Sequence, residues 1–436
     1  MAATSAAPTP DAVPGNAGIW WRRQQASFTG NNTVGLLRGG DELFPAQCEA
    51  ISNARHDVWL ASYIFNNDTA GQRTVRALLR AARRGARVRV VVDGFGSRAN
   101  LPWLTEQFLG SAVALAVFRP IDGLLGWMRP GQLQRLHQKL CVVDSEHAFV
   151  GGINIIDDRI DLGHGVLDAP RLDFAVSLAG PVVAAVEQTC RAVWTRAWLG
   201  RDFREEFVAI VRSAEPVERG KRWLRQLRMP KTQIALEAVA ELPAMRAAFV
   251  LRDNLRSRRT IERAYVDAIT SAQNRVDLIS PYFYPGSTFR RALCDTAARG
   301  VKVRLLLQGK ADYRIATLAA QVLYDELLAH GVCIYEYTPA FLHAKVALVD
   351  QHWATVGSSN IDPLSLLLNL EANVIVLDQQ FNAALAAQFE EAVAVSRQVD
   401  AKDPTRRSGW TATLRRAVVA WGAYVYLRVA GATGKY

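Results

Sequence analysis

Cysteine is scarce in this sequence, and the few copies it has are scattered. The five cysteines stand at positions 48, 141, 190, 294 and 333, and no two of them form a Cys-x-x-Cys pair. This spacing argues against a disulfide scaffold and against a zinc site. We therefore expect the thiols to be small buried apolar groups, and we predict neither a metal nor another cofactor.

Long apolar runs and targeting signals are also missing. No uninterrupted apolar stretch reaches the roughly 20 residues that a membrane-spanning helix requires. The first 18 residues are rich in alanine and proline, and they lack the basic start and apolar core of a secretory signal. We expect this segment to be a disordered leader, and the body of the protein to stay in water or lie on a surface.

Positive charge is in excess, and hydrophobic residues are plentiful. Of 436 residues, 52 are Lys or Arg and 41 are Asp or Glu, which gives a formal net charge of +11, and 50% are hydrophobic. This length and composition predict two or three globular domains. The basic excess favours anionic partners, which include nucleic acids, acidic lipid headgroups and phosphorylated substrates.

The chain repeats itself. An apolar run at 57–65 precedes a helical segment and then RGARVRVVVDG at 84–94, and the same order recurs at 276–284 and 299–309. The runs are nearly continuous and rich in β-branched residues, which is typical of strands covered on both faces of a sheet. Each half is therefore predicted to contain a right-handed strand–helix–strand unit.

The segment 73–83 between the first two runs has the pattern of an amphipathic helix. Its apolar residues recur at intervals of three and four and form one stripe: Val75, Leu78, Leu79 and Ala82. We predict an α/β fold in which two such halves pack as a pseudo-twofold pair.

A second pattern follows each of these units. The copy from His137 to Asn154 and the copy from His343 to Asn360 both read HxKx4Dx6G[GS]xN. The offset between the copies is 206 residues at both the histidine and the first glycine. One His-x-Lys on a strand is usually incidental, but packing alone does not explain two copies that share five identical positions.

The spacing within each copy favours phosphate chemistry. Alternate residues of a strand share a face, so the His and Lys of each copy point the same way. The next strand brings back two small residues, which admit a ligand close to the backbone, and an asparagine that offers donors to a phosphate. One imidazole of such a pair attacks phosphorus, while the other protonates the departing alkoxide and then activates an alcohol or water.

The two motifs resemble those of the phospholipase D superfamily, and the resemblance extends over roughly residues 35–400. GSSNIDPLSLLLNLEANVIV from residue 357, YIFNNDTAG from residue 63 and RDNLRSRRTIERAY from residue 252 resemble bacterial cardiolipin synthases, in particular the shorter cardiolipin synthase B subgroup. The resemblance implies two phospholipase D-like α/β/α sandwich lobes with the active site at their interface. It also implies a phosphohistidine intermediate and transfer of a phosphatidyl group from phosphatidylglycerol to a second lipid alcohol, with release of glycerol.

The resemblance carries family roles onto individual positions. His137 and His343 match the catalytic pair, which we assign as nucleophile and general acid. The residues that match phosphate-binding groups are Lys139, Lys345, Asn154 and Asn360. Glu371 matches a carboxylate that orients a catalytic histidine, and Asp173 is the candidate for the same role in the first half.

Two further pairs of motif residues complete the candidate site. Asp144 and Asp350 belong to the catalytic motifs, and we expect them to build strand ends rather than perform chemistry. Ser358 and Gly152 occupy equivalent positions near the substrate phosphate. Because glycine lacks the hydroxyl, we expect the first half to have one phosphate donor fewer, worth about 1 kcal/mol.

The sequence also predicts how the chain is divided and where it meets lipid. We expect a leader at 1–18, a first lobe at 19–205, a basic connection at 206–250, a second lobe at 251–400 and a basic, aromatic tail at 401–436. The candidate docking segments are ERGKRWLRQLR at 218–228, the tail, and the loop at 123–130. A peripheral position on the cytoplasmic face of the bacterial inner membrane follows, with anionic phospholipid such as phosphatidylglycerol as the partner and no nucleic acid.

Three alternatives remain open at this stage. A phosphatidylserine synthase or a hydrolytic phospholipase D would share the chemistry up to the phosphohistidine and differ only in the acceptor. A nucleic-acid phosphodiesterase would also suit the positive charge, although the interfacial aromatic segments and the NLEANVIV stretch favour lipid. An inactive membrane-binding module ranks last, because both His-Lys pairs are intact.

Overall fold

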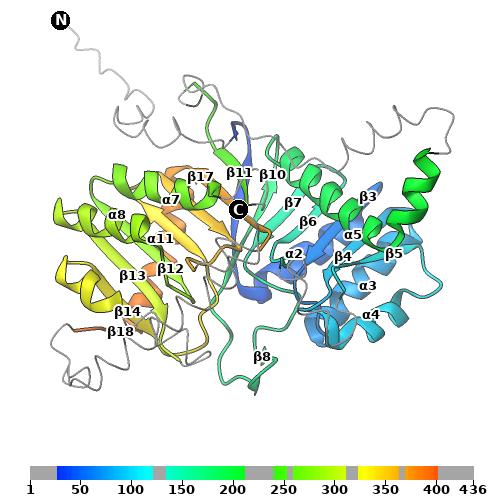
Figure 1. Cartoon of the computed structure of the whole chain (residues 1–436), viewed down its shortest axis with the longest axis horizontal. Helices are drawn as coiled ribbons and strands as arrows, with labels where there is room; N and C mark the ends of the chain where they lie inside the picture. Colours follow the sequence, from blue (N-terminus) through cyan, green and yellow to red (C-terminus); the bar gives the residue numbers. More distant parts are fainter. Residues whose placement is uncertain are drawn as a thin grey trace, which may run out of the picture.

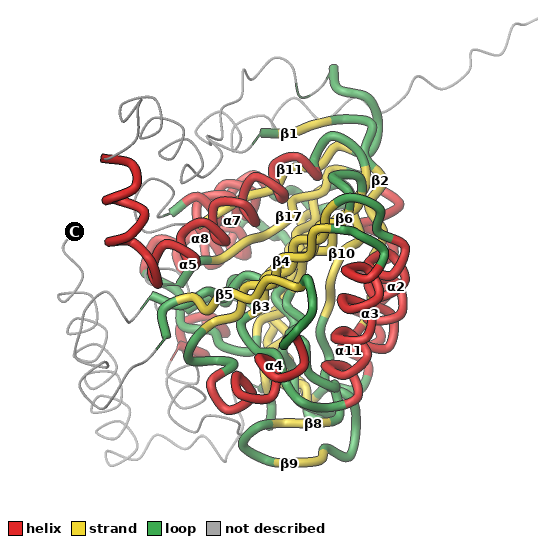
Figure 2. Tube along the Cα trace, turned by 90° about the vertical axis from the view of Figure 1, so that its right-hand side faces the viewer, coloured by secondary structure: helices red, strands yellow, loops and turns green. Residues whose placement is uncertain are grey.

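The computed structural model describes residues 27–120, 134–211, 239, 241–252, 259–310, 323–362 and 369–400. They form two α/β lobes side by side, each with a central sheet that has helices on both faces (Figures 1 and 2). The predicted leader and the three predicted docking segments (218–228, 401–436 and 123–130) lie outside the described residues.

The sheet of the first lobe has seven strands in the order β2-β10-β7-β6-β3-β4-β5. The strands are β2 (Thr33–Arg38), β3 (Asp57–Ser62), β4 (Arg87–Asp93), β5 (Val113–Phe118), β6 (Lys139–Val143), β7 (His147–Gly151) and β10 (Phe174–Ala179). One face is covered by α2 (Gly39–Asn53), α3 (Thr69–Arg83), η1 (Arg98–Asn100) and α4 (Leu101–Phe108), and the other by α5 (Val183–Val211). A small hairpin, β8 (Ile160–Asp161) and β9 (Gly165–Val166), stands apart from the sheet.

The sheet of the second lobe has nine strands in the order β1-β11-β17-β16-β15-β12-β13-β14-β18. The strands are β1 (Phe28–Thr29), β11 (Arg246–Arg252), β12 (Arg275–Ser280), β13 (Lys302–Gln308), β14 (Cys333–Tyr337), β15 (Val346–Val349), β16 (Trp353–Gly357), β17 (Glu371–Leu377) and β18 (Arg397–Gln398). One face is covered by α7 (Thr260–Ser271), α8 (Ser287–Ala298) and a helical segment at 323–329, and the other by α11 (Gln379–Ala394).

The predicted strand–helix–strand units are present in both lobes. β3 pairs in parallel with β4, and β12 pairs in parallel with β13. The helix predicted at 73–83 begins earlier, at Thr69, because the Asp68 carboxylate accepts a hydrogen bond from Gly71 N (3.0 Å) and caps the helix. Val75 and Leu78 are buried, whereas Leu79 is only partly buried.

One apolar core joins the lobes. Val150 and Val176 on the first sheet belong to the same buried cluster as Val356 and Val374 on the second, and β7 contacts both β16 and β17. Burial of this shared apolar surface holds the two sheets in a fixed relation. The two segments that carry the His-Lys motifs are therefore positioned by packing between the lobes as well as within each one.

The first strand within the described residues belongs to the second lobe. Phe28 and Thr29 pair with Ala248 and Ala247 on β11, and the chain then enters the first lobe at β2. Two strands therefore fall across the predicted divisions: β1 lies within the predicted first lobe at 19–205, and β11 straddles the boundary at 250. The remaining lobe boundaries stay predictions.

The cysteines are mostly buried, as expected from their scattered positions. All five thiols are free, four are buried and Cys333 is partly buried. In the part of the chain that the structure describes, every helix is too short or too polar to cross a bilayer.

Candidate active site

The first histidine stands where a segment of one lobe runs beside a segment of the other. Leu136 forms a parallel bridge with Leu370, and His137 N donates to Leu370 O (3.1 Å). This backbone pairing brings the His137 ring to Glu371, with 3.0 Å between Nδ1 and Oε2. The fully buried carboxylate thus serves the histidine of the opposite lobe.

The second histidine repeats this arrangement with the lobes exchanged. Leu172 bridges to Leu342, and His343 N donates to Leu172 O (2.8 Å). His343 Nδ1 lies 2.6 Å from Asp173 Oδ2. The other carboxylate oxygen, Oδ1, accepts a hydrogen bond from the backbone N–H of the next residue, Phe174 (2.8 Å). The carboxylate that contacts the second histidine therefore comes from the first lobe.

These contacts select the reactive nitrogen of each ring. An ionised carboxylate only accepts hydrogen bonds, so the nitrogen that faces it, Nδ1, carries the proton. In the neutral imidazole the lone pair is then on Nε2. Both His137 and His343 are therefore prepared to react through Nε2.

The two motif lysines are buried beside the histidines. Lys139 Nζ donates to His137 O (2.6 Å), and Lys345 Nζ donates to His343 O. Burial lowers the pKa of Lys139 to about 7 and that of Lys345 to about 8, because a buried ammonium loses its hydration. The site can therefore gain or lose positive charge near neutral pH.

The surroundings of both histidines favour the neutral ring by lowering its pKa. Burial lowers the pKa of His137 below its ordinary value, although Glu371 opposes the shift. Burial lowers the pKa of His343 much further, and the neighbouring cations Lys345 and Arg171 act in the same direction. A neutral ring suits a nucleophile, whereas a general acid needs the negative charge of a bound phosphate to raise its pKa.

The carboxylates differ from each other. Burial pushes the pKa of Glu371 upward, but His137, Lys139 and a hydroxyl donor outweigh it and hold the pKa below its ordinary value. Burial dominates at Asp173 and raises its pKa to about 6. Glu371 therefore stays ionised over a wider range of pH than Asp173.

The hydroxyl donor to Glu371 corrects one expectation from the sequence. Ser358 Oγ donates to Glu371 Oε2 (2.5 Å) and accepts from Ala372 N (3.0 Å), so this buried hydroxyl holds the carboxylate rather than a phosphate. At the equivalent Gly152, an added Cβ would lie 2.4 Å from Asp173 Oδ1. The absence of a side chain at Gly152 therefore makes room for the Asp173 carboxylate, and it does not remove a phosphate donor from the first half.

The two motif aspartates bind backbone. Asp144 accepts hydrogen bonds from the N–H groups of residues 55–57, and Asp350 accepts from those of residues 273–275. Both adopt left-handed backbone angles, with φ of +53° and +51°. These contacts fasten the turns after β6 and β15 to the starts of β3 and β12, as expected for residues that build strand ends.

The two motif asparagines are buried just beyond the strands that precede them. Asn154 follows β7 and accepts from Ile64 N (3.2 Å), at the carboxyl end of β3. Asn360 follows β16 in the same way. Both stay predictions as phosphate ligands.

Several residues near the histidines were not predicted. The Tyr63 ring meets the His137 ring edge-on at 5.2 Å, and Lys139 Nζ lies 5.5 Å from the same tyrosine. Fully buried Asp93 accepts from Leu136 N (2.8 Å) and so supports the crossing segment. The signal for Asp93 was available, because an acidic residue that ends a buried apolar strand needs a partner.

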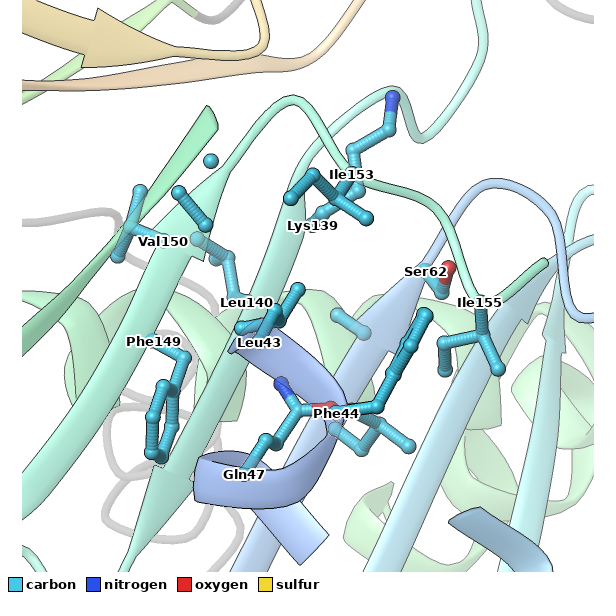
Figure 3. A pocket seen from close by; sticks show the side chains of 14 residues that line it. Leu43, Phe44, Gln47, Ser62, Lys139, Leu140, Phe149, Val150, Ile153 and Ile155 are labelled. Atoms are coloured by element: carbon cyan, nitrogen blue, oxygen red, sulfur yellow. The ribbon is translucent and has the colours of Figure 1, made fainter. Parts of the chain in front are cut away.

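A small cavity lies beside Lys139, between α2 and the first sheet (Figure 3). Leu43, Phe44 and Gln47 line it from the helix, and the lysine ammonium points away from them. Its volume of about 20 Å³ is sufficient for a single water molecule and far too small for a lipid headgroup. This cavity therefore does not bind substrate.

Two α/β lobes that each give one His-Lys pair to a shared site define the phospholipase D class of proteins. Residues 47–164 and 265–393 match the family described as "Cardiolipin synthase, PLD-like domain". The chain is 37% identical over 388 residues to cardiolipin synthase B of Salmonella typhi, which covers 88% of this chain and 86% of that protein. It is 35% identical over 394 residues to cardiolipin synthase B of Escherichia coli K12, covering 89% and 87%. The chain belongs to the phospholipase D-like cardiolipin synthase family.

Solved structures confirm the fold. Phosphatidylserine synthase of Haemophilus influenzae superposes with a TM-score of 0.67 at 13% identity, covering 95% of this chain and 99% of that one. Polyphosphate kinase of Porphyromonas gingivalis superposes with a TM-score of 0.51, also at 13% identity, over 90% of this chain and 53% of that one. At such identities the likeness concerns architecture alone, and the predicted pair of similar α/β lobes is confirmed.

Proposed function

We propose that the protein is a cardiolipin synthase that transfers a phosphatidyl group from phosphatidylglycerol to the alcohol of a second phospholipid and releases glycerol. The observation that carries the proposal is the pair of crossed contacts, in which His137 meets Glu371 and His343 meets Asp173 from opposite lobes. The likeness to two proteins named cardiolipin synthase B, at 35–37% identity, supports this choice of lipid acceptor.

The first step forms a phosphohistidine. His137 Nε2 attacks the phosphorus of phosphatidylglycerol, and the bond from phosphorus to the glycerol oxygen breaks. His343 donates a proton to that oxygen, so glycerol leaves neutral. Ionised Glu371 stabilises the positive charge that develops on the His137 ring as the nitrogen–phosphorus bond forms.

The second step returns the enzyme to its starting state. His343, now neutral, takes the proton of the incoming lipid alcohol, and the alcohol oxygen attacks phosphorus. The nitrogen–phosphorus bond breaks, and His137 is released. In both steps the donors that hold the nonbridging oxygens are Lys139, Lys345, Asn154 and Asn360.

We place the enzyme peripherally on the cytoplasmic face of the bacterial inner membrane, where phosphatidylglycerol is its anionic partner. The net charge of +11 supports attraction to an anionic lipid surface. Both phosphates of the reaction belong to lipids, so nucleic acid is not expected as a substrate.

The test of this function is an analysis of products. Purified protein incubated with phosphatidylglycerol vesicles is expected to yield cardiolipin and glycerol in equal amounts, measured by mass spectrometry. A parallel incubation with serine, and one with an oligonucleotide and no lipid, serve as controls. Phosphatidylserine, phosphatidic acid without cardiolipin, or cleavage of the oligonucleotide alone would each point to a different member of the superfamily.

The buried lysines and Asp173 predict a narrow pH optimum for kcat/KM. Below about 6 Asp173 is protonated and no longer supports His343, and above about 7 to 8 Lys139 and then Lys345 lose the charge that binds phosphate. A bound anion stabilises both ammonium groups, so kcat should decline at a higher pH than kcat/KM. Initial rates across about pH 5 to 9 check this.

The lysine assignment has its own control. Lys139→Arg keeps a positive charge at every accessible pH, so the alkaline decline should move upward in this variant. An alkaline limb that stays in the same place would mean that Lys139 does not cause it.

A further inference from the structure

The β8–β9 hairpin is an addition to the first lobe. Asp173 follows Asn154 by 19 positions, whereas Glu371 follows Asn360 by 11 positions. Ile160 pairs with Val166, and the tip turns at Gly165, whose φ is +77°. The hairpin projects away from both sheets at one end of the molecule (Figures 1 and 2).

The tip of the hairpin exposes apolar side chains. The large apolar side chains that stay exposed in the described part of the chain are Phe95, Leu109, Leu162, Val166, Trp198 and Val395. Two of them are on the hairpin, with Leu162 58% exposed and Val166 84% exposed. Exposed apolar area is unfavourable in water, and a tight turn does not require large apolar residues. The stability of the hairpin in water therefore does not explain Leu162 and Val166 at its tip.

The hairpin is attached at the segments that lead to His343 and its carboxylate. Arg171, which stands two residues before Asp173, donates from Nη2 to Ile160 O (2.5 Å). The His164 ring lies 5.1 Å from that of Phe341, two residues before His343. The exposed tip therefore stands beside the His343 half of the site and contacts both lobes.

A second exposed apolar side chain stands on the His137 half. Phe95, 39% exposed, follows β4, and Asp93 accepts hydrogen bonds both from Phe95 N (2.8 Å) and from Leu136 N (2.8 Å). Leu136 directly precedes His137. Exposed apolar residues thus lie near the chain segment that leads to each histidine.

The charges at the tip are compatible with an apolar boundary. Asp161 accepts from the N–H groups of Gly163 (2.8 Å) and His164 (3.0 Å), and the His164 ring nitrogen lies 2.9 Å from the same oxygen. These donors pair with one carboxylate oxygen, and Arg171 Nη2 lies 3.9 Å from the other. The acidic group therefore keeps partners within the hairpin region when the tip leaves water.

We propose that the β8–β9 hairpin inserts Leu162 and Val166 into the apolar boundary of a phospholipid bilayer and holds the mouth of the active site against that surface. The choice of a bilayer as the occupant rests on the proposed function, in which both substrates are lipids. The docking residues are not part of the catalytic machinery.

The test compares the exposed apolar residues of the hairpin with an exposed leucine elsewhere on the first lobe. Leu109 is 81% exposed at the turn before β5, which is the edge of the sheet opposite the site, so Leu109→Ser is the matched control. Partitioning onto vesicles of phosphatidylglycerol and phosphatidylcholine is measured by flotation. The double variant L162S/V166S should partition about 30-fold more weakly than the unmodified protein, and L109S should partition equally well.

Activity gives an independent measure. L162S/V166S should lose turnover on vesicles in proportion to its lost binding and keep full turnover on a water-soluble short-chain phosphatidylglycerol. Partitioning of L162S/V166S within about twofold of the unmodified protein, or an equal loss in L109S, would overturn the proposal.

A fluorophore reports insertion directly. Gly163 accepts a side chain, since an added Cβ would lie 3.4 Å from Asp161 Oδ1, an ordinary contact. A polarity-sensitive dye on Gly163→Cys should shift to shorter wavelength when vesicles are added, and the unmodified protein treated with the same dye gives the background. An unshifted spectrum on bound protein overturns insertion of the tip. Vesicle binding through the hairpin without cardiolipin production would overturn the proposed function and leave the docking proposal standing.

Discussion

His343→Gln should still release p-nitrophenol from a p-nitrophenyl phosphodiester, whereas His137→Gln should release none. The reason is the leaving group: p-nitrophenolate departs without a proton, so the first step no longer needs a general acid. Without His343 no base activates the acceptor, and the reaction should stop after about one equivalent, with the phosphoryl group on His137. Stopped-flow absorbance and intact-protein mass spectrometry measure the burst and the adduct.

On phosphatidylglycerol both variants should lose about 10⁴-fold in turnover, because glycerol leaves only with a proton. His147 is exposed at the start of β7, and His147→Gln is the control, with unchanged activity on both substrates. A burst in His137→Gln and none in His343→Gln would reverse the assigned roles. Full turnover in either variant would remove the pair from the mechanism.

Glu371→Gln and Asp173→Asn should each lower turnover by about 10²- to 10⁴-fold with little effect on vesicle binding. An amide presents a donor as well as an acceptor, so it allows Nδ1 to lose its proton and Nε2 to gain one. The proton on Nε2 then blocks attack on phosphorus or uptake of the acceptor proton. Turnover and single-turnover burst rates measure the two effects separately.

The carboxylates should be distinguishable. Glu371→Gln should slow the burst with the p-nitrophenyl substrate, whereas Asp173→Asn should spare the burst and remove the acid limb of the pH profile near 6. Ser358→Ala removes one of the hydrogen bonds to Glu371 and should cost only about fivefold. Exposed Glu106→Gln is the control for a lost carboxylate, and an equal loss there would point to a general effect on stability.

Much of this architecture could be predicted from the sequence because the relevant patterns are local. Strand–helix–strand units and a motif repeated at a constant offset are readable within short windows, and both are present in the structure. The resemblance to a known family supplied Glu371 and Asp173. Which histidine each carboxylate serves could not be predicted, because the contacts join residues 234 and 170 positions apart through packing between lobes.

The wrong assignment of Ser358 has a similar cause. A hydroxyl beside a phosphate motif looks like a ligand until the structure shows a carboxylate from β17 within hydrogen-bonding distance. The β8–β9 hairpin and β1 were also missed, because strands of two residues have no periodicity to recognise. Sequence patterns thus identified the histidines and lysines, and only the tertiary structure showed which residues hold each histidine in place.

The position of β1 has a consequence for biosynthesis. Phe28 and Thr29 leave the ribosome well before their partners on β11, which emerge more than 200 residues later. At translation rates of about 5–20 residues per second, the strand waits for roughly 10 to 40 s. The amino-terminal lobe therefore completes its own sheet while β1 is still unpaired, and docking of that strand is a late event that fastens the newly made halves together.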